Sequence, residues 1–510
     1  MKTLKKTVVT HSYNLHDIAE AFCRTSKAVL VRETQTRKVY RFKMPNGHGY
    51  YLKIVSLQGY SVKSVYRYLR LWFEYKHHAF LLKKGATLAQ LVGFIRLPAR
   101  NGGVSSVAII TEEVQDSCPM SDMSELSDEM INKLAQFLIN NYRNGFIHKD
   151  LHFGNILWNE DKKKFVFVDT GQIIWRRNVG IRAVVKNVVV LYNSFFILPC
   201  FKTDQWDYFL NRFINEYLSS DISMSKWVKF ALSHTRKVFY RWLNKRTRRC
   251  FKQNADFIPF RHNGLRGVCT KDVAGVWKEV DISQKLQALF NSSAQYLKDS
   301  RSTCVIKTRL ERYANPVVIK RFNVKRRFDP LKNVLRKSRA YRSWWWGWSM
   351  WFQKIPVAQP LFFFEQRRFF LLKENFYAMS YYQDTYTLSD YLNSDILFNK
   401  KEFLRKFAQL VVKLNNSSVI HRDFQLKNVL VQPSGSDYRF YIIDIESVSG
   451  AKIDCEKKLW KHLYQLRKSY LRLNDTGIFT TSQLCYFIKL VFGDSYRNNR
   501  ILIRNRLFKT

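Results

Sequence analysis

Hydrophobic and polar residues alternate near the start of the chain and then change to a helical period. Residues 27–44 and 50–55 alternate with a period of two and are joined by the glycine-containing segment 45–49, which predicts two strands and a tight turn. Residues 61–84 place apolar side chains three or four positions apart and stop at Gly85, which predicts an amphipathic helix. A strand, a turn, a second strand and a helix are therefore expected first.

The segments that follow also predict both strands and helices. Residues 88–97 and 104–114 alternate like strands, residues 127–142 have an amphipathic helical pattern, and residues 165–168 predict a short strand. Residues 183–201 are the longest apolar stretch, but a lysine and two asparagines interrupt it. A buried helix is expected there rather than a membrane span, which needs about 20 apolar residues.

The second half of the chain repeats this order. Residues 317–320 predict a strand, and residues 361–364 and 369–372 predict a hairpin. The tryptophan cluster 344–348 falls at the position of the main helix, where we expect aromatic core packing rather than a membrane or sugar contact. Ala89 and Ala358 lie in matching segments 269 positions apart, so whole domains are repeated.

Composition supports folded domains and adds a strong charge. Hydrophobic residues make up 46% of the 510 positions and aromatic residues 15%, which is ample for packed cores and argues against disorder. The formal net charge of +46 calls for an anionic environment, which is a nucleic acid, an acidic membrane leaflet or a polyanionic substrate. Charge alone does not choose among these three, but it predicts binding that weakens with salt.

The cysteines and the N-terminus indicate an intracellular setting. The eight cysteines are scattered without the short spacing of a zinc site or a redox pair, so we expect reduced, mostly buried thiols. Residues 7–17 lack an apolar core, so no signal peptide is expected. We therefore expect a cytoplasmic protein.

Two short stretches contain the same chemistry in the same order. Each has a histidine, a basic residue and an aspartate, then an asparagine five positions on, and a second aspartate after a strand. The two sets are His148-Lys149-Asp150 with Asn155 and Asp169, and His421-Arg422-Asp423 with Asn428 and Asp444. Phosphoryl transfer from ATP needs one carboxylate to accept a proton, and an amide and a second carboxylate to hold magnesium. Each stretch supplies that set.

The order of residues also gives roles in the first copy. Lys53 in a strand would grip the ATP phosphates, and Glu74, the one acidic residue of the following helix, would orient it. Asp150 would be the catalytic base, and Asn155 and Asp169 would bind magnesium. Taken singly, a strand lysine is a solvent-facing residue and a helix glutamate is a surface ion pair. The complete order favours the kinase interpretation.

The second copy has a less complete set. Lys320, Asp423, Asn428 and Asp444 correspond to the residues above, but the position matching Glu74 is Ser343. Asp329 is the only acidic residue between Lys320 and Glu365, and the metal-binding triplet ends in Glu446 instead of glycine. Either Lys320 has another partner, or this copy is weakened or regulatory.

These features predict an α+β fold with two tandem, bilobal protein-kinase-like domains, residues 1–244 and 245–510. Each is expected to have a small, mostly antiparallel β-sheet lobe with one main helix, and a larger helical lobe. Residues 110–114 are the expected adenine-contacting hinge of the first domain.

The chain resembles the bacterial lipopolysaccharide kinases, the family of Kdo and heptose kinases. The resemblance lies in the segment 248–254, in the run 355–361 and in the His-x-Asp loop of each copy. It implies a kinase-like fold and transfer of the γ-phosphoryl group of ATP, with Mg²⁺, to a hydroxyl of a Kdo or heptose sugar in the lipopolysaccharide core. The glycine-rich phosphate loop of protein kinases is missing, and residues 32–38 and 307–312 are expected in its place.

The resemblance also implies a partner and a location. Lipopolysaccharide or another anionic glycolipid would be the substrate, and the basic surface would hold the enzyme peripherally on the inner face of the anionic inner membrane, with each Lys or Arg contributing about 1 kcal/mol near the surface. Nucleic acid is then not the expected partner, and the oligomeric state is left open.

Three alternatives follow from the same residues. A protein kinase would use the same catalytic loop on a seryl or tyrosyl hydroxyl. A pseudokinase scaffold, or an enzyme with a partly degenerate, regulatory second domain, would bind Mg-ATP weakly at one site or both. A nucleic-acid binder would use the basic surface at physiological salt.

Overall fold

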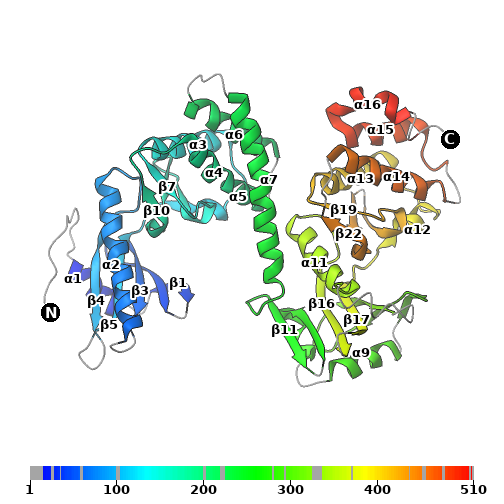
Figure 1. The fold of residues 1–510 in the computed structure, drawn as a ribbon, viewed down its shortest axis with the longest axis horizontal. Helices are drawn as coiled ribbons and strands as arrows, with labels where there is room; N and C mark the ends of the chain where they lie inside the picture. Colours follow the sequence, from blue (N-terminus) through cyan, green and yellow to red (C-terminus); the bar gives the residue numbers. More distant parts are fainter. Residues whose placement is uncertain are drawn as a thin grey trace. The chain divides into compact units, whose positions relative to one another are not determined.

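The computed structural model describes residues 15–24, 28–34, 36–57, 61–98, 104–198, 203–218, 224–262, 264–277, 281–291, 295–323, 336–368, 371–435, 437–450, 455–473, 477–504 and 507. Contacts between residues divide the chain into two compact units, Met1–Phe239 and Tyr240–Thr510. The division falls within one long helix, α7 (Met224–Arg249), which also contains the predicted boundary at residues 244–245 (Figure 1).

The first lobe of unit 1 is a five-stranded antiparallel sheet in the order β1-β2-β3-β5-β4, with α2 as its main helix (Figure 1). Ser61 caps α2, and Gly85 follows it with a positive φ of 87°. Residues 28–44 form two strands, because the chain reverses after Thr34, so the predicted single strand was wrong. The elements are α1 (Leu15–Arg24), β1 (Val29–Thr34), β2 (Arg37–Lys43), β3 (Gly49–Ser56), α2 (Val62–Lys83), β4 (Leu91–Pro98) and β5 (Val104–Glu112).

The second lobe of unit 1 is mainly helical. Its core surrounds α3 and contains large buried aromatic side chains such as Phe146, Phe195 and Trp206. The predicted helix at residues 183–201 is two shorter helices, because a 3₁₀ turn at Val189–Leu191 separates α4 from α5. The elements are β6 (Ser117–Pro119), α3 (Asp128–Arg143), β7 (Phe146–His148), β8 (Ile156–Asn159), β9 (Lys164–Phe167), β10 (Ile173–Trp175), α4 (Ile181–Val188), α5 (Tyr192–Ile197) and α6 (Thr203–Leu218), followed by α7.

The first lobe of unit 2 has the same strand order with two strands added at one edge. The order β13-β14-β15-β17-β16 matches that of unit 1, and the hairpin β11-β12 pairs with β16. The tryptophan cluster lies on α11, where Trp344 is fully buried against Phe257 and Phe363, as core packing predicts. The elements are β11 (Phe257–His262), β12 (Leu265–Thr270), α8 (Lys271–Ala274), α9 (Ile282–Asn291), β13 (Gln295–Ser300), β14 (Thr303–Arg309), β15 (Pro316–Phe322), α11 (Arg339–Phe352), β16 (Pro360–Arg368) and β17 (Leu371–Ser380).

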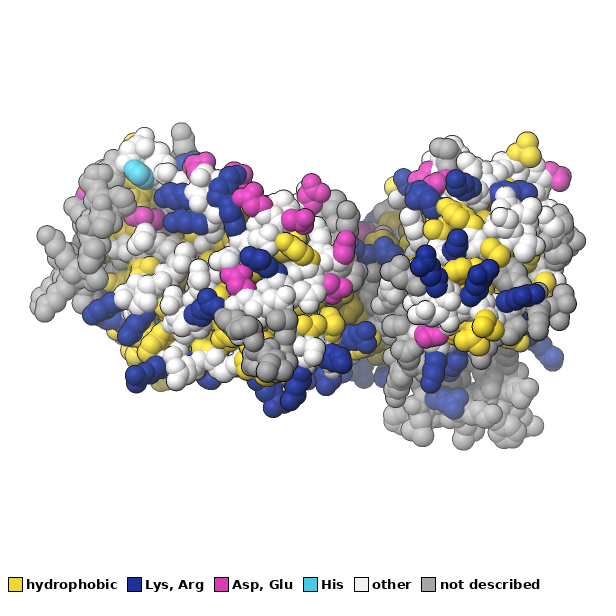
Figure 2. All heavy atoms as spheres, turned by 90° about the horizontal axis from the view of Figure 1, so that it is seen from above, with side chains coloured by type: hydrophobic (Ala, Val, Ile, Leu, Met, Phe, Trp, Pro, Cys, Tyr) yellow, Lys and Arg dark blue, Asp and Glu magenta, His cyan; other side chains and the backbone are white. Residues whose placement is uncertain are grey.

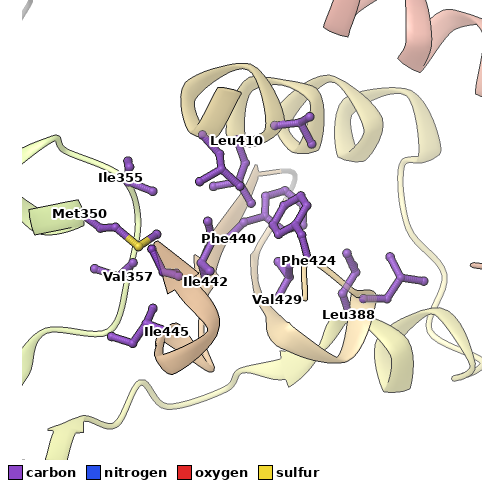
Figure 3. Packing of buried hydrophobic residues seen from close by; sticks show 14 of the residues in the cluster. Met350, Ile355, Val357, Leu388, Leu410, Phe424, Val429, Phe440, Ile442 and Ile445 are labelled. Carbon is purple, nitrogen blue, oxygen red and sulfur yellow. The ribbon is translucent and has the colours of Figure 1, made fainter. Parts of the chain in front are cut away.

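The second lobe of unit 2 packs helices around a central α13. Its core extends to the loop after β21, where Ile445 lies beside Val357 and Ile442 (Figure 3). The elements are β18 (Tyr386–Thr387), α12 (Leu388–Leu392), α13 (Lys400–Asn416), β19 (Val419–His421), β20 (Val429–Ser434), β21 (Asp437–Ile442), β22 (Val448–Gly450), α14 (Cys455–Tyr470), α15 (Thr481–Phe492) and α16 (Tyr496–Ile503). The predicted α+β, kinase-like fold class is confirmed.

The main helices of the two units end in the same way. Gly85 after α2 and Lys354 after α11, 269 positions apart, both have positive φ angles, of 87° and 56°. Beyond these residues, the Ala86 N–H donates to the Leu81 carbonyl, and the Ile355 N–H donates to the Met350 carbonyl. This is the bond pattern of a left-handed helix cap. The spacing of 269 read from the sequence therefore aligns the two helices residue by residue.

Some predicted features lie at the limits of the described chain. Residue 27, residues 199–201, residues 369–370, Asp329 and most of the N-terminal segment 7–17 are outside the described residues. Within the described residues, none of the helices is both long and apolar enough to cross a membrane. Of the cysteines in that part, Cys250, Cys269 and Cys304 are buried free thiols, Cys485 is a half-buried one, and Cys118 is exposed.

Candidate active sites

The cleft of unit 1 brings together three of the predicted residues from three elements. Lys53 projects from β3 and forms an ion pair with Glu74 of α2, and its Nζ lies 3.6 Å from the Asp169 carboxylate, just after β9. All three side chains are at least two-thirds buried. Burial lowers the pKa of Lys53, against the attraction of Glu74. Two buried carboxylates around one lysine leave a polar cleft with one excess negative charge.

The catalytic loop of unit 1 presents Asp150 to solvent and keeps its neighbours inside. The Asp150 carboxylate is 65% exposed, whereas His148 is buried and hydrogen-bonded to the Val168 carbonyl at 3.0 Å. Burial lowers the pKa of His148 below its usual value, as expected for a neutral, structural histidine. The Asn155 amide nitrogen donates to the Asp150 carbonyl at 2.9 Å.

Unit 2 arranges its loop in nearly the same way. His421 is bonded to the Ile443 carbonyl at 3.2 Å, and burial lowers its pKa. The Asn428 amide donates to the Asp423 carbonyl at 2.8 Å and to the Asp423 carboxylate at 3.0 Å. Gln425 also donates to that carboxylate. Asp423 is therefore more tightly held than Asp150.

The strand lysine of unit 2 has a different partner from its counterpart. Lys320 of β15 lies 3.1 Å from Asp444, and its side chain is only 9% exposed. Asp169 and Asp444 both adopt left-handed backbone angles, with φ of 55° and 61°. The structure thus pairs Lys320 directly with the predicted metal-binding aspartate.

Glu446 adds a second acidic group beside that pair. Its carboxylate is 11% exposed and accepts a hydrogen bond from Arg339 of α11. Burial raises the pKa of Glu446, while Lys320 and Arg339 oppose the change. Burial would also raise the pKa of Asp444, but Lys320 and the hydrogen bond with Glu446 outweigh it and hold that pKa well below its usual range.

The basic segments expected in place of a glycine-rich loop are only partly where they were predicted. Residues 32–38 contain the turn between β1 and β2, one strand away from Lys53. Residues 307–312 instead lie at the end of β14 and in the turn before β15. The turn that corresponds to the β1-β2 turn contains Arg301 and Ser302, so the prediction for residues 307–312 was wrong.

The donor atoms in each cleft suit magnesium. In both loops the side-chain nitrogen of the asparagine donates a hydrogen bond to a backbone carbonyl, which leaves the amide oxygen available as a ligand atom. With Asp169 or Asp444, each cleft offers one amide oxygen and one carboxylate, which are hard donors of the kind that Mg²⁺ prefers. Asn155 with Asp169, and Asn428 with Asp444, are the residues that fit the ion.

Sequence reasoning missed one side chain at the second cleft, Arg339. Arg339, on the first turn of α11, contacts Glu446, and the Ser343 hydroxyl turns back to the Arg339 carbonyl at 3.0 Å. The signal was present, because a buried glutamate where the kinase triplet has glycine calls for a cationic partner. A hollow in unit 2 is lined by Trp346, His421, Trp460 and Tyr464, and Lys320 is not part of its lining.

A small antiparallel sheet with one main helix, a buried strand lysine and a catalytic loop between two short strands define the class of the protein: each unit is a kinase-like domain. Residues 350–489 match the lipopolysaccharide kinase (Kdo/WaaP) family, and residues 60–194 match the ABC1 atypical kinase-like domain. Both matched families are kinase-like, and the chain is a phosphotransferase. That its first half matches a different kinase-like family was not predicted.

Three solved structures have limited similarity to the chain. "WaaP in complex with acyl carrier protein" is 14% identical and covers 48% of this chain and 100% of its own, with a TM-score of 0.35. "Amicoumacin kinase hAmiN in complex with AMP-PNP, Ca2+ and Ami" is 11% identical over 45% of this chain and 86% of its own, with a TM-score of 0.30. The bifunctional kinase-methyltransferase WbdD is 17% identical over 40% of this chain and 43% of its own, with a TM-score of 0.28. No curated protein matches the chain.

Proposed function

We propose that this protein is an ATP- and magnesium-dependent kinase that phosphorylates a hydroxyl of a lipopolysaccharide core sugar, Kdo or heptose. The observation that carries the proposal is the buried lysine of unit 1, held between Glu74 and Asp169. The family match of residues 350–489 supports the class of acceptor.

The residues of unit 1 then have distinct tasks. Lys53 binds phosphate oxygens, and Glu74 keeps its ammonium group in place. Asp150 accepts the proton of the acceptor hydroxyl, for which its exposed carboxylate is accessible. Asn155 and Asp169 hold magnesium, which neutralises the developing charge on the phosphates when it is bound. In unit 2, Asp423, Asn428, Asp444 and Lys320 take the corresponding tasks.

The acceptor proposal rests further on the charge of the molecule. A lipopolysaccharide core is a polyanion, and Lys and Arg side chains lie on the face of both parts drawn in Figure 2. The net charge of +46 favours such a substrate and an anionic bilayer over a neutral acceptor.

The outer face of α2 offers a surface for that bilayer. Val62, Tyr66 and Phe73 are 88%, 64% and 66% exposed on this helix. Lys63 and Arg70 are exposed between them. Apolar side chains flanked by cations are the pattern of helices that lie on acidic membranes. We assign this face, in the proposed function, to peripheral contact with the inner membrane.

The direct test is transfer of label from [γ-³²P]ATP to purified lipopolysaccharide core oligosaccharide, with casein and a total protein fraction as competing acceptors. We expect magnesium-dependent labelling of the sugar, lost in the double variant Asp150→Asn, Asp423→Asn. Labelling of protein alone would instead make the chain a protein kinase. Equal sugar labelling by the double variant would rule out both proposed bases.

The membrane contact has its own test. Vesicles with about one-third anionic lipid should sediment the full chain at low salt, and binding should fall several-fold in the triple variant Tyr66→Ser, Leu69→Ser, Phe73→Ser. The variant Leu397→Ser removes another exposed apolar side chain, in unit 2, and should bind like the wild type. Equal binding of all three proteins would remove α2 from the proposed contact.

A further inference from the structure

The carboxylate beside the strand lysine comes from different elements in the two units. In unit 1 it is Glu74 on the main helix, and the third residue of the metal-binding triplet is Gly171. In unit 2 the helix position is Ser343, and the third triplet residue is Glu446. The two units therefore differ at both positions. At each position, one unit has a glutamate and the other has a small residue.

The space in unit 1 links the two positions. A Cβ atom built on Gly171 would lie 3.1 Å from the carboxyl carbon of Glu74 and 3.2 Å from its Oε1. Any side chain at residue 171 would therefore grow into the volume that the Glu74 carboxylate occupies. The α2 helix and the triplet thus face each other across a space that holds a single acidic group.

In unit 2 the glutamate belongs to the triplet, and the helix contributes only a serine. Ser343 is fully buried, and its hydroxyl is bonded to the helix backbone at Arg339 rather than directed at Lys320. Glu446 is nearly buried and bonded to Arg339. Its carboxyl group also shares a hydrogen bond with Asp444. Glu446 therefore joins Arg339 of the helix to Asp444, the carboxylate that Lys320 contacts.

We propose that Glu446 is the positioning residue of the second cleft, replacing the helix carboxylate of the first: it holds Asp444 and the ammonium group of Lys320 in the geometry that binds Mg-ATP. The second cleft is then a working nucleotide site with its acid moved to the metal-binding loop, and not one weakened by the loss of that acid. This inference rests on the proposed function only in that the bound nucleotide is the phosphoryl donor.

The test moves the acid back to the helix. In the full chain, with the first cleft silenced by Lys53→Ala and Asp169→Ala, Mg-ATP affinity of the second cleft is measured by calorimetry. We expect Glu446→Gly to weaken binding about 10-fold, which is an ordinary cost of losing one charged partner. Adding Ser343→Glu should recover most of it. Glu446→Gln, which keeps the side chain's size, should behave like Glu446→Gly.

The matched exchange is made in the first cleft, with the second silenced by Lys320→Ala and Asp444→Ala. Glu74→Ser should weaken Mg-ATP binding by a similar factor, and Gly171→Glu in that background should recover part of it. Gly171→Glu alone should impair binding, because two acidic side chains then compete for one space. Hydrogen exchange shows whether each variant keeps its fold, measured at β3 and β9 for the first-cleft variants and at β15 and β21 for the second-cleft variants.

Rescue in the second cleft by Ser343→Glu would establish the exchange, because a merely structural loss at residue 446 is not repaired from the helix. The inference would be overturned if the Glu446→Gly variant is folded and binds Mg-ATP as well as its parent. It would also be overturned if Ser343→Glu leaves the binding of the folded Glu446→Gly variant as weak as before. The inference would be overturned as well if the parent chain, with only its first cleft silenced, binds no nucleotide at the second cleft. In that case, sugar phosphorylation that depends on Asp150 would show that the proposed function stands without it.

Discussion

The two clefts of this protein differ in how the main helix meets the metal-binding triplet. In unit 1, His78 of α2 is bonded to the Ala89 carbonyl at 2.9 Å and to the Thr170 hydroxyl at 3.2 Å. In unit 2, the residue 269 positions later is Gly347, and it lies against Ile445. A polar pair has become a small residue and an apolar one, just as the glutamate lies on the helix in unit 1 and in the triplet in unit 2.

This comparison teaches that the contact is maintained by pairs of residues rather than by single ones. A histidine at residue 347 would have no room, and a glycine at residue 78 would leave Thr170 without its partner. Close packing makes each residue depend on the one that faces it. Single positions therefore look degenerate when they are compared alone, while the pairs remain complementary.

The largest expected effect concerns the two catalytic aspartates. Asp150→Asn or Asp423→Asn should each lower phosphoryl transfer at its own site by about 10²–10⁴, which is the usual contribution of a positioned base. Initial rates of sugar labelling, measured for both variants at saturating ATP, assign the activity to one cleft or both. If the labelling rate falls less than 3-fold in both single variants and in the double variant, neither aspartate is the catalytic base.

The tight helix contact of unit 2 is the next target. Gly347→Ala places a Cβ atom 2.7 Å from Pro360 and 3.0 Å from Ile445, so we expect a loss of about 2 kcal/mol in local stability. Hydrogen exchange of β16 and β17 amides measures it. Gly275→Ala, in the same unit but with open space around the new atom, is the control and should change little. Equal effects would show that the close approach of α11 is not tight.

Acid should weaken unit 2 through a buried histidine. His462 is fully buried and accepts a hydrogen bond from the His421 N–H at 3.3 Å. Burial, with smaller contributions from Lys458 and His421, lowers its pKa to about 3, against about 6.5 in an unfolded chain. Between these values only the unfolded chain binds the proton, so stability is complete above about pH 6.5 and falls as the pH decreases.

The expected loss from His462 at pH 5 is roughly 1–2 kcal/mol. In unit 1 the catalytic-loop backbone at His148 is held by Asn187, which does not titrate, with its amide 3.0 Å from the carbonyl. His462→Asn should therefore reduce the acid sensitivity of unit 2, read from hydrogen exchange of β19 between pH 7 and pH 5. An unchanged pH dependence in this variant would contradict the assignment.

The smallest expected effect is at Ser343. Because its hydroxyl is bonded to its own helix, Ser343→Ala should change Mg-ATP binding less than 2-fold, whereas Glu74→Gln at the matching position should weaken it about 10-fold. Calorimetry on the full chain, with the other cleft silenced in each case, gives both values. A large effect of Ser343→Ala would mean that the helix still contributes to the second site.

Much of this architecture could be predicted from the sequence. The helical period and Gly85 located α2 to within one residue at each end. The strand lysines and the loop residues follow one another at spacings that few folds share, so their proximity to the post-strand aspartates was predictable. Local patterns succeeded where the signal lay within one element.

The remainder depends on contacts between distant segments. The reversal after Thr34 has no proline or glycine to mark it, so two strands were read as one. Likewise the hairpin β11-β12 joins a sheet whose other strands begin about 25 residues later, which periodicity does not reveal. The partner of Glu446 required Arg339 to be brought near from 107 residues away.

If the chain contains two nucleotide clefts, it should bind two nucleotides. Calorimetric titration of the full chain with a non-hydrolysable ATP analogue and Mg²⁺ should give two bound per chain, falling to one in Lys53→Ala and to one in Lys320→Ala. Binding of no nucleotide, or binding unaffected by either substitution, would contradict the account.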